Sequence, residues 1–360
     1  MSKVKELVNL ASVIFTVLLI GSCGGAGGPV EVTNGQSGAD SSVAETKVES
    51  LLTDFTVKNS TRFELYEHPT SMVFPLKKGE HFDVSSFHIR DSQGEIVPAQ
   101  FEVLNKWWHI ENQPLRHVLA HFNSNVSAFN DSNSDSGVSN YQLYKGNYNK
   151  LPEQPVAVDN SVTEIVVRNG LIEFKIDKHS GKISTPAGEL QSLFYNESGQ
   201  VDYSLKHSNI DYLVEEEGPL RTVVKLSSVT EYRTPTDIKH GWAMRLYFYA
   251  NSPLVQIDFQ LQNSAKNETF SAPLYFKGHK LRIDNARVLD DLAIKAEIPP
   301  LAGIETLSNG VVSASNIAVS VKDFWQRFPT GIELKRNGQI DIELWPTWAK
   351  QFYDTSYVDP

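Results

Sequence analysis

The stretch GWAMRLYFYANSPLVQIDFQLQ runs from Gly241 to Gln262 and decides the fold class. In both halves, large apolar residues alternate with polar or aromatic ones, which is the two-residue period of a β-strand. Between the halves, Ala250-Asn251-Ser252-Pro253 is a turn signal. The stretch therefore predicts an antiparallel hairpin with one apolar face. The opposite face, with aromatic rings, an Arg, amides and a carboxylate, suits sugar contacts, although a solvated sheet face would look the same.

Strand patterns like this one extend on both sides of the hairpin, and few segments have a helical period. Pro152-Glu153-Gln154-Pro155 marks a linker between two series of strands. The first series predicts a small β-barrel over residues 53–151. The second predicts a larger antiparallel β-sandwich over residues 156–346. The fold class is therefore all-β, and we expect residues 347–360 to begin a further domain that this chain does not complete.

The N-terminus has the features of an exported lipoprotein. Lys3 and Lys5 precede an apolar run that ends at Ile20, as in a signal peptide covering residues 1–23. Ile20-Gly21-Ser22-Cys23 resembles a bacterial lipobox, which implies lipidation of Cys23 and a location at the outer membrane or cell surface. A plain secretory leader with a free thiol is the alternative. Residues 24–52 are poor in large apolar side chains and predict a flexible linker.

Charge and cysteine content exclude several classes of function. The chain has a net charge of −10, so nucleic acid is not an expected partner. An acidic polysaccharide would require a local cluster of Arg, Lys or His, or a bound cation, to overcome that field. The single cysteine excludes internal disulfides and cysteine metal clusters. We predict no cofactor, although binding of a divalent cation such as Ca²⁺ is not excluded by the sequence.

The tryptophans and histidines of the first strand series are candidate ligand contacts. Trp107 and Trp108 could stack on sugar rings, but adjacent residues of a strand face opposite ways, so at most one would reach a ligand. Core packing is the alternative, and on general grounds it explains such tryptophans more often than ligand contact does. His117 and His121 would lie ~13 Å apart along a strand, too far to share one metal ion directly.

Several short motifs, taken in order, resemble the PcRGLX/YetA-like family, which includes exo-rhamnogalacturonan lyases. They are Phe74-Pro75-Leu76-Lys77-Lys78-Gly79, the segment Gly94–Gln100, the segment Trp108–Phe122, Glu217-Gly218-Pro219-Leu220-Arg221, the segment Arg245–Pro253, the segment Asp323–Pro329 and Glu343-Leu344-Trp345-Pro346. The resemblance implies a RIFT-related barrel, a central β-sandwich and a C-terminal (α/α) toroid. We expect the toroid to be absent or truncated in this chain, and Glu111-Asn112-Gln113-Pro114 replaces the expected Asp-Gly-Ser turn.

If the resemblance holds, the reaction would be β-elimination beside a uronate. That reaction requires a base, a group that neutralises the carboxylate, and an acid for the leaving oxygen. The densest group of suitable residues is His240, Arg245, Tyr247 and Tyr249, and the last three share one strand face. Cross-strand packing would also explain them. A non-catalytic glycan-binding or scaffold lipoprotein is the alternative function, and a glycoside hydrolase with paired carboxylates is not excluded.

Overall fold

The computed structural model confirms the all-β class. It describes residues 12–21, 49–133, 136–146, 148, 150–196, 198–203, 205, 210–228, 240–263, 276–284, 294–297, 310–314, 317–324, 326–327, 330–335 and 337–346. The chain divides into two compact units. The N-terminal unit comprises Gly24–Pro155 with Gly218–Arg221, and the second unit comprises Met1–Cys23, Val156–Glu217 and Thr222–Pro360. The expected further domain at 347–360 lies outside the described residues.

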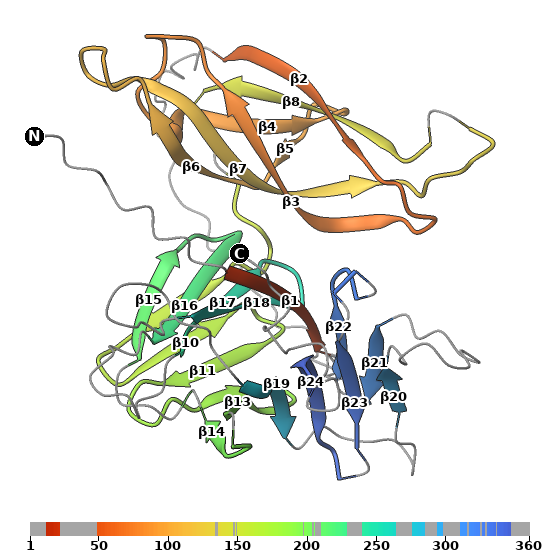
Figure 1. The fold of residues 1–360 in the computed structure, drawn as a ribbon. Coiled ribbons are helices and arrows are strands. Elements are labelled where there is room, and N and C mark those ends of the chain that lie inside the picture. Colours follow the sequence, from red (N-terminus) through yellow and green to blue (C-terminus); the bar gives the residue numbers. More distant parts are fainter. Residues whose placement is uncertain are drawn as a thin grey trace, which may run out of the picture. The chain divides into compact units, whose positions relative to one another are not determined.

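In the described residues of the N-terminal unit, drawn mainly in orange and yellow in Figure 1, the chain forms two antiparallel sheets and one 3₁₀ turn. The four-stranded sheet has the order β2 (Ser50–Lys58), β8 (Val138–Lys145), β4 (Phe87–Asp91), β5 (Ile96–Val97). The three-stranded sheet has the order β3 (Leu65–Pro75), β7 (Leu115–Val126), β6 (Ala99–Lys106), and η1 covers Val84–Ser86.

The pairings described do not close these two sheets into the barrel that the sequence predicted. At Pro98, the chain leaves one sheet after β5 and enters the other with β6. Proline has no N–H to donate, so a continuous ladder is interrupted there. An aromatic core nevertheless joins the sheets, because the ring of Phe55 on β2 lies 5.7 Å from that of Phe122 on β7 and 5.0 Å from that of Phe74 on β3.

A short segment from later in the chain belongs to the N-terminal unit. The side-chain oxygen of Gln100 on β6 accepts hydrogen bonds from the backbone N–H groups of Leu220 and Arg221, both at 3.1 Å. Its amide nitrogen donates to the carbonyl of Arg221 at 3.2 Å. At Gly218 an added Cβ would lie 2.1 Å from the Gln100 side-chain oxygen, so a larger residue there would force the Gln100 amide to shift and weaken these hydrogen bonds.

Two larger sheets form the second unit. The seven-stranded sheet has the order β15 (Asp211–Glu216), β16 (Arg221–Ser228), β17 (His240–Tyr249), β18 (Leu254–Asn263), β1 (Ser12–Gly21), β22 (Ile317–Val321), β21 (Val311–Ala314). The other sheet has the order β20 (Ile294–Glu297), β23 (Gly331–Leu334), β24 (Ile340–Trp345), β19 (Phe276–Asp284), β13 (Gly188–Asn196), β12 (Ile183–Thr185), β11 (Glu173–Asp177), β10 (Glu164–Arg168), β9 (Ala157–Asn160), with β14 (Val201–Tyr203) also paired to β13.

The hairpin predicted at Gly241 to Gln262 is β17 and β18, and its apolar faces form part of the sandwich core. Met244 pairs with Phe259 and Leu246 with Ile257, and all four side chains are fully buried. Asn251 in the turn has φ 55°, a left-handed conformation that Asn tolerates better than most residues. Opposite sheets meet where the ring of Phe259 stacks on His279 of β19 at 4.3 Å. The unit is thus the predicted sandwich.

The apolar segment that predicts a signal peptide is strand β1 of this sheet, between β18 and β22 (Figure 1). Cys23 and the expected linker up to residue 48 lie outside the described residues. No helix in the described part of the chain has the length and apolarity needed to cross a membrane.

Candidate functional site

The loop between β6 and β7 holds both tryptophans singled out in the sequence. Trp107 is anchored by its backbone, whose N–H donates to the carbonyl of Pro114 at 2.8 Å and whose carbonyl accepts from the N–H of Ile110 at 3.0 Å. Asn112 and Gln113 have φ of 61° and 44°. A left-handed glutamine costs about 1 kcal/mol, so the surrounding contacts hold this loop in a strained conformation.

Two cations flank the indole ring of Trp107. The guanidinium of Arg116, from the start of β7, lies 4.7 Å from the ring centroid. The ammonium group of Lys78, from the loop after β3, lies 6.0 Å away, within the range of a cation–π contact. The ring of His109 approaches edge-on at 5.8 Å. We call Lys78, Trp107, Trp108, His109 and Arg116 the Trp107 patch.

The Trp107 patch has groups available for a ligand. Trp108 is 68% exposed, unusual for a side chain whose burial would be strongly favourable. Neither Arg116 nor Lys78 forms an ion pair with a described carboxylate, and both are exposed. The patch therefore combines an open aromatic face with cations that can accept an anionic partner.

The second candidate group lies on the outer face of β17. Arg245, Tyr247 and Tyr249 are partly buried there, as strand periodicity predicts. The Arg245 guanidinium donates to both carboxylate oxygens of Glu215, at 2.6 and 3.0 Å. Tyr249 donates to the side chain of Gln256 at 3.2 Å. His240 begins β17, but its side chain lies outside the described residues.

Glu215 is held ionised by its neighbours. Burial would raise the pKa of this carboxyl, but hydrogen bonds from Arg245 and Lys225 outweigh that effect and lower it. The same hydrogen bond, with the charge of Glu215, raises the pKa of Arg245. Arg245 is thus committed to a carboxylate of its own sheet, which leaves it poorly placed to neutralise the carboxylate of a substrate.

A third charged cluster lies on β19 and β24, around the fully buried Asp341. Its carboxylate accepts from Arg282 at 2.6 and 3.0 Å and from Lys280 and Lys335 at 2.8 Å each. Burial alone would raise the pKa of Asp341, but these hydrogen bonds hold it well below its ordinary value. Glu333 lies 3.8 Å from Lys335, and all three cations around Asp341 already bind its carboxylate. We interpret it as a structural network.

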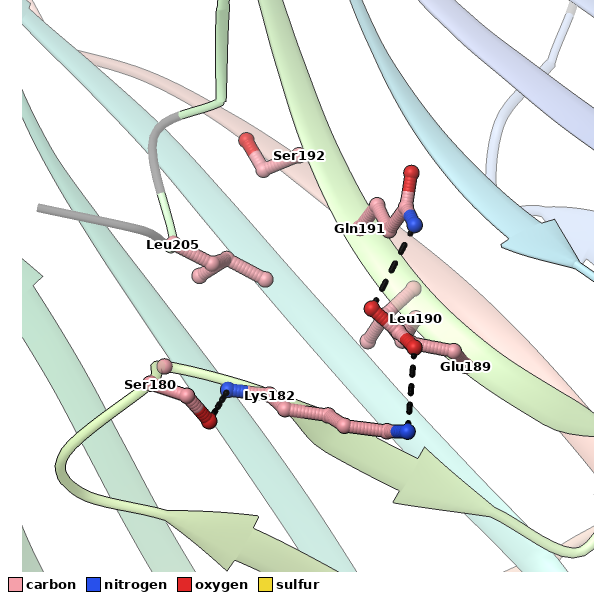
Figure 2. Close-up of a pocket in the computed structure, with 8 residues that line it drawn as sticks. Ser180, Lys182, Glu189, Leu190, Gln191, Ser192 and Leu205 are labelled. Carbon is pink, nitrogen blue, oxygen red and sulfur yellow. Dashed lines mark hydrogen bonds and ion pairs between the residues drawn. The ribbon is translucent and has the colours of Figure 1, made fainter.

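A pocket of about 330 Å³ opens at the edge of β13. Pairing with β12 stops at Leu190 and pairing with β14 starts at Leu193, so Gln191 and Ser192 lie in the gap. Figure 2 shows Lys182 reaching across the pocket to Glu189, 3.3 Å away, with Gln191 donating to the same carboxylate. Because its charged groups already pair with each other, the pocket has no cation in excess for an anionic ligand.

The histidines of β7 have separate surroundings. His117 is bonded to the side chain of Asn105 at 2.8 Å. His121 is buried, with Ser71 at 2.7 Å and the Arg221 guanidinium at 2.8 Å. Burial, reinforced by the charge of Arg221, lowers the pKa of His121 to about 3.

Sequence reasoning named the tryptophans but not the cations beside them. In the sequence, η1, β4, β5 and β6 lie between Lys78 and Trp107. Arg116 follows a turn whose two left-handed residues bring the start of β7 back to the indole. The available signals were the pair Lys77-Lys78 and an Arg two residues after Pro114. Neither signal indicates a tryptophan as the neighbour.

Comparisons with known proteins give little further information. No family model matches the chain, and no curated protein matches it. Among solved structures, a protein in glycosyl hydrolase family 38 from Enterococcus faecalis is similar with a TM-score of 0.40 and 11% sequence identity, over 81% of this chain and 40% of that one. The chain therefore spans less than half the length of that protein. A similarity of this size carries no argument about function.

Proposed function

We propose that the chain is a glycan-binding lipoprotein of the cell surface that holds a uronate-containing polysaccharide at the Trp107 patch. The observation that carries the proposal is the exposed Trp108 beside Arg116 and Lys78, neither of which is ion-paired within the described residues. An acidic polymer approaching a chain of net charge −10 needs such a local cluster of cations.

The chemistry of a uronate fits the parts of this patch. A pyranose ring has an apolar face that can lie on the Trp108 indole, and its carboxylate can accept two parallel hydrogen bonds from a guanidinium. The Arg116 side chain is already oriented by its contact with Trp107, so less conformational entropy is lost on binding. Hydrogen bonds to charged groups contribute about 1.5–3 kcal/mol each, roughly a 10- to 100-fold effect on affinity.

Calorimetric titration with polygalacturonate and with a neutral polymer of similar length tests the proposal. Arg116→Ala should weaken polygalacturonate binding by about 10-fold or more, and Trp108→Ala by about 5- to 10-fold. Arg62→Ala and Phe63→Ala are matched controls, because both residues are highly exposed in the same unit away from Trp107. The proposal would be contradicted if the control variants lost as much affinity for polygalacturonate as the Arg116 and Trp108 variants. It would also be contradicted if the unmodified protein bound the neutral polymer as tightly as polygalacturonate.

The second candidate function is that of a polysaccharide lyase, acting on rhamnogalacturonan-type polymers by β-elimination. The family resemblance suggests it, and Arg245, Tyr247 and Tyr249 on one face of β17 supply the residue types that the reaction requires. The ion pair between Arg245 and Glu215 favours holding a glycan over cleaving it.

Ultraviolet absorbance of the unsaturated product distinguishes the two candidates. Incubation with rhamnogalacturonan should leave the absorbance flat if the chain only binds. A steady rise that Tyr247→Phe abolishes, while Tyr66→Phe on the N-terminal unit has no effect, would establish the lyase instead. Tyr66 is a suitable control because it is 76% exposed.

A further inference from the structure

Strand β1 occupies a central position in the seven-stranded sheet although its sequence is that of a leader peptide. It pairs antiparallel with β18 from Ser12↔Gln262 to Ile20↔Leu254 and with β22 from Val17↔Val321 to Gly21↔Ile317. Figure 1 shows it in dark red between those strands. Cleavage before Cys23 would therefore remove a paired inner strand and leave a slot about 9.5 Å wide between β18 and β22.

We propose that this slot is a strand-acceptor site, which the leader fills in the precursor and an apolar β-strand of a partner protein fills in the mature chain. The proposal is independent of glycan binding and rests on removal of the leader at Cys23.

An empty slot would be unfavourable in two respects. Backbone N–H and C=O groups along Leu254–Asn263 and Ile317–Val321 would form open sheet edges, which readily pair with another strand. Removal of β1 would also expose to solvent one side of three fully buried residues on the neighbouring strands, Ile257, Phe259 and Val319. The residues after Cys23 cannot replace β1, because Gly24 to Glu49 has few large apolar side chains. A strand added from a partner would form hydrogen bonds with both open edges and would bury the exposed apolar side chains again.

The register defines the chemistry of the incoming strand. Leu19 is opposite Val255 on one side and Val319 on the other, both buried. Leu18 is opposite Gln256 and Ser320, both only partly buried. An acceptable strand therefore requires apolar residues at the odd positions of β1 and tolerates polar residues at the even ones.

A peptide titration tests both the site and its register. The full chain is expressed in cells, the protein is recovered from their membranes, and its N-terminal residue is identified by mass spectrometry. A synthetic peptide of Ser12–Gly21 with a solubilising lysine tail is then added. At 100-fold excess over its Kd, we expect the Tm to rise by about 5–10 °C. The peptide with Leu18→Lys should raise the Tm by a similar amount, and the matched peptide with Leu19→Lys should leave the Tm unchanged.

Three results would overturn the proposal. The first is a mature protein that begins at Met1, because β1 would then be permanent. The second is a protein that begins at Cys23 and does not bind the peptide, because the sheet would then have closed without a strand. The third is equal binding of the Leu18→Lys and Leu19→Lys peptides, because attachment would then not follow the register of β1.

Discussion

Asp341→Asn should strongly destabilise the second unit. The wild-type carboxylate is fully buried and accepts from Arg282, Lys280 and Lys335. Removing its charge leaves three cations close together, and breaking a buried ion pair costs about 3–5 kcal/mol. The cationic side chains are 13–32% exposed and can turn toward water, so we expect the lower end, about 3 kcal/mol. For a unit of 150–250 residues this lowers Tm by about 6–12 °C.

Calorimetry, together with hydrogen exchange of peptides from β19, β23 and β24, measures this effect. Glu173→Gln is the matched control, because Glu173 also pairs with two cations, Arg168 and Lys175, but is 43% exposed. We expect no measurable change there. The pKa of Asp341 is lowered in the folded state, so its contribution is complete above about pH 4 and is lost as the pH falls further. An Asp341→Asn effect no larger than that of Glu173→Gln would refute the reasoning.

Three further predictions concern other parts of the chain. His121 stays neutral in the fold because its pKa is lowered to about 3, so the free energy of unfolding is highest above about pH 6.5 and falls in acid. Measured by urea unfolding, the wild type should lose about 2 kcal/mol more of this free energy between pH 7.5 and pH 5 than the His121→Gln variant. Equal losses in the wild type and the variant would contradict this prediction. Gly181→Ala should lower Tm more than Gly94→Ala, because both have positive φ but only the first would place a Cβ 1.4 Å from the carbonyl oxygen of Leu205. Cys23→Ser should move the protein from the membrane to the soluble fraction, and continued membrane association would disprove lipidation at this residue.

Local periodicity was sufficient to predict many of the strands, but not Ser12–Gly21, and it did not give the partners of the strands. The β17–β18 hairpin follows from alternation and a short turn, both of which are properties of neighbouring residues. The pairing of Ser12–Gly21 with β18 joins segments more than 200 residues apart, and an apolar run without polar alternation gives no sign of which face it presents. The same run fits a leader and a buried strand equally well.

The candidate site was predictable only in part for a related reason. Exposed aromatic residues and basic pairs are visible in the sequence, but the distance from Arg116 to the Trp107 ring depends on the path of the eight-residue loop 107–114. Arg245 showed the converse, since it was expected to be available and pairs instead with Glu215 from a strand 30 residues earlier. Whether a charged side chain can bind a ligand therefore depends on partners that lie far away in the sequence.

The attachment of Gly218–Arg221 to β6 has a practical consequence for anyone dissecting the molecule by limited proteolysis. A fragment that ends at Pro155 would retain every strand of the N-terminal unit and still lose the Leu220 side chain, which is 3% exposed in the intact chain, along with the backbone that Gln100 binds. Supplying residues 218–221 as a separate peptide should restore part of the fragment's heat resistance.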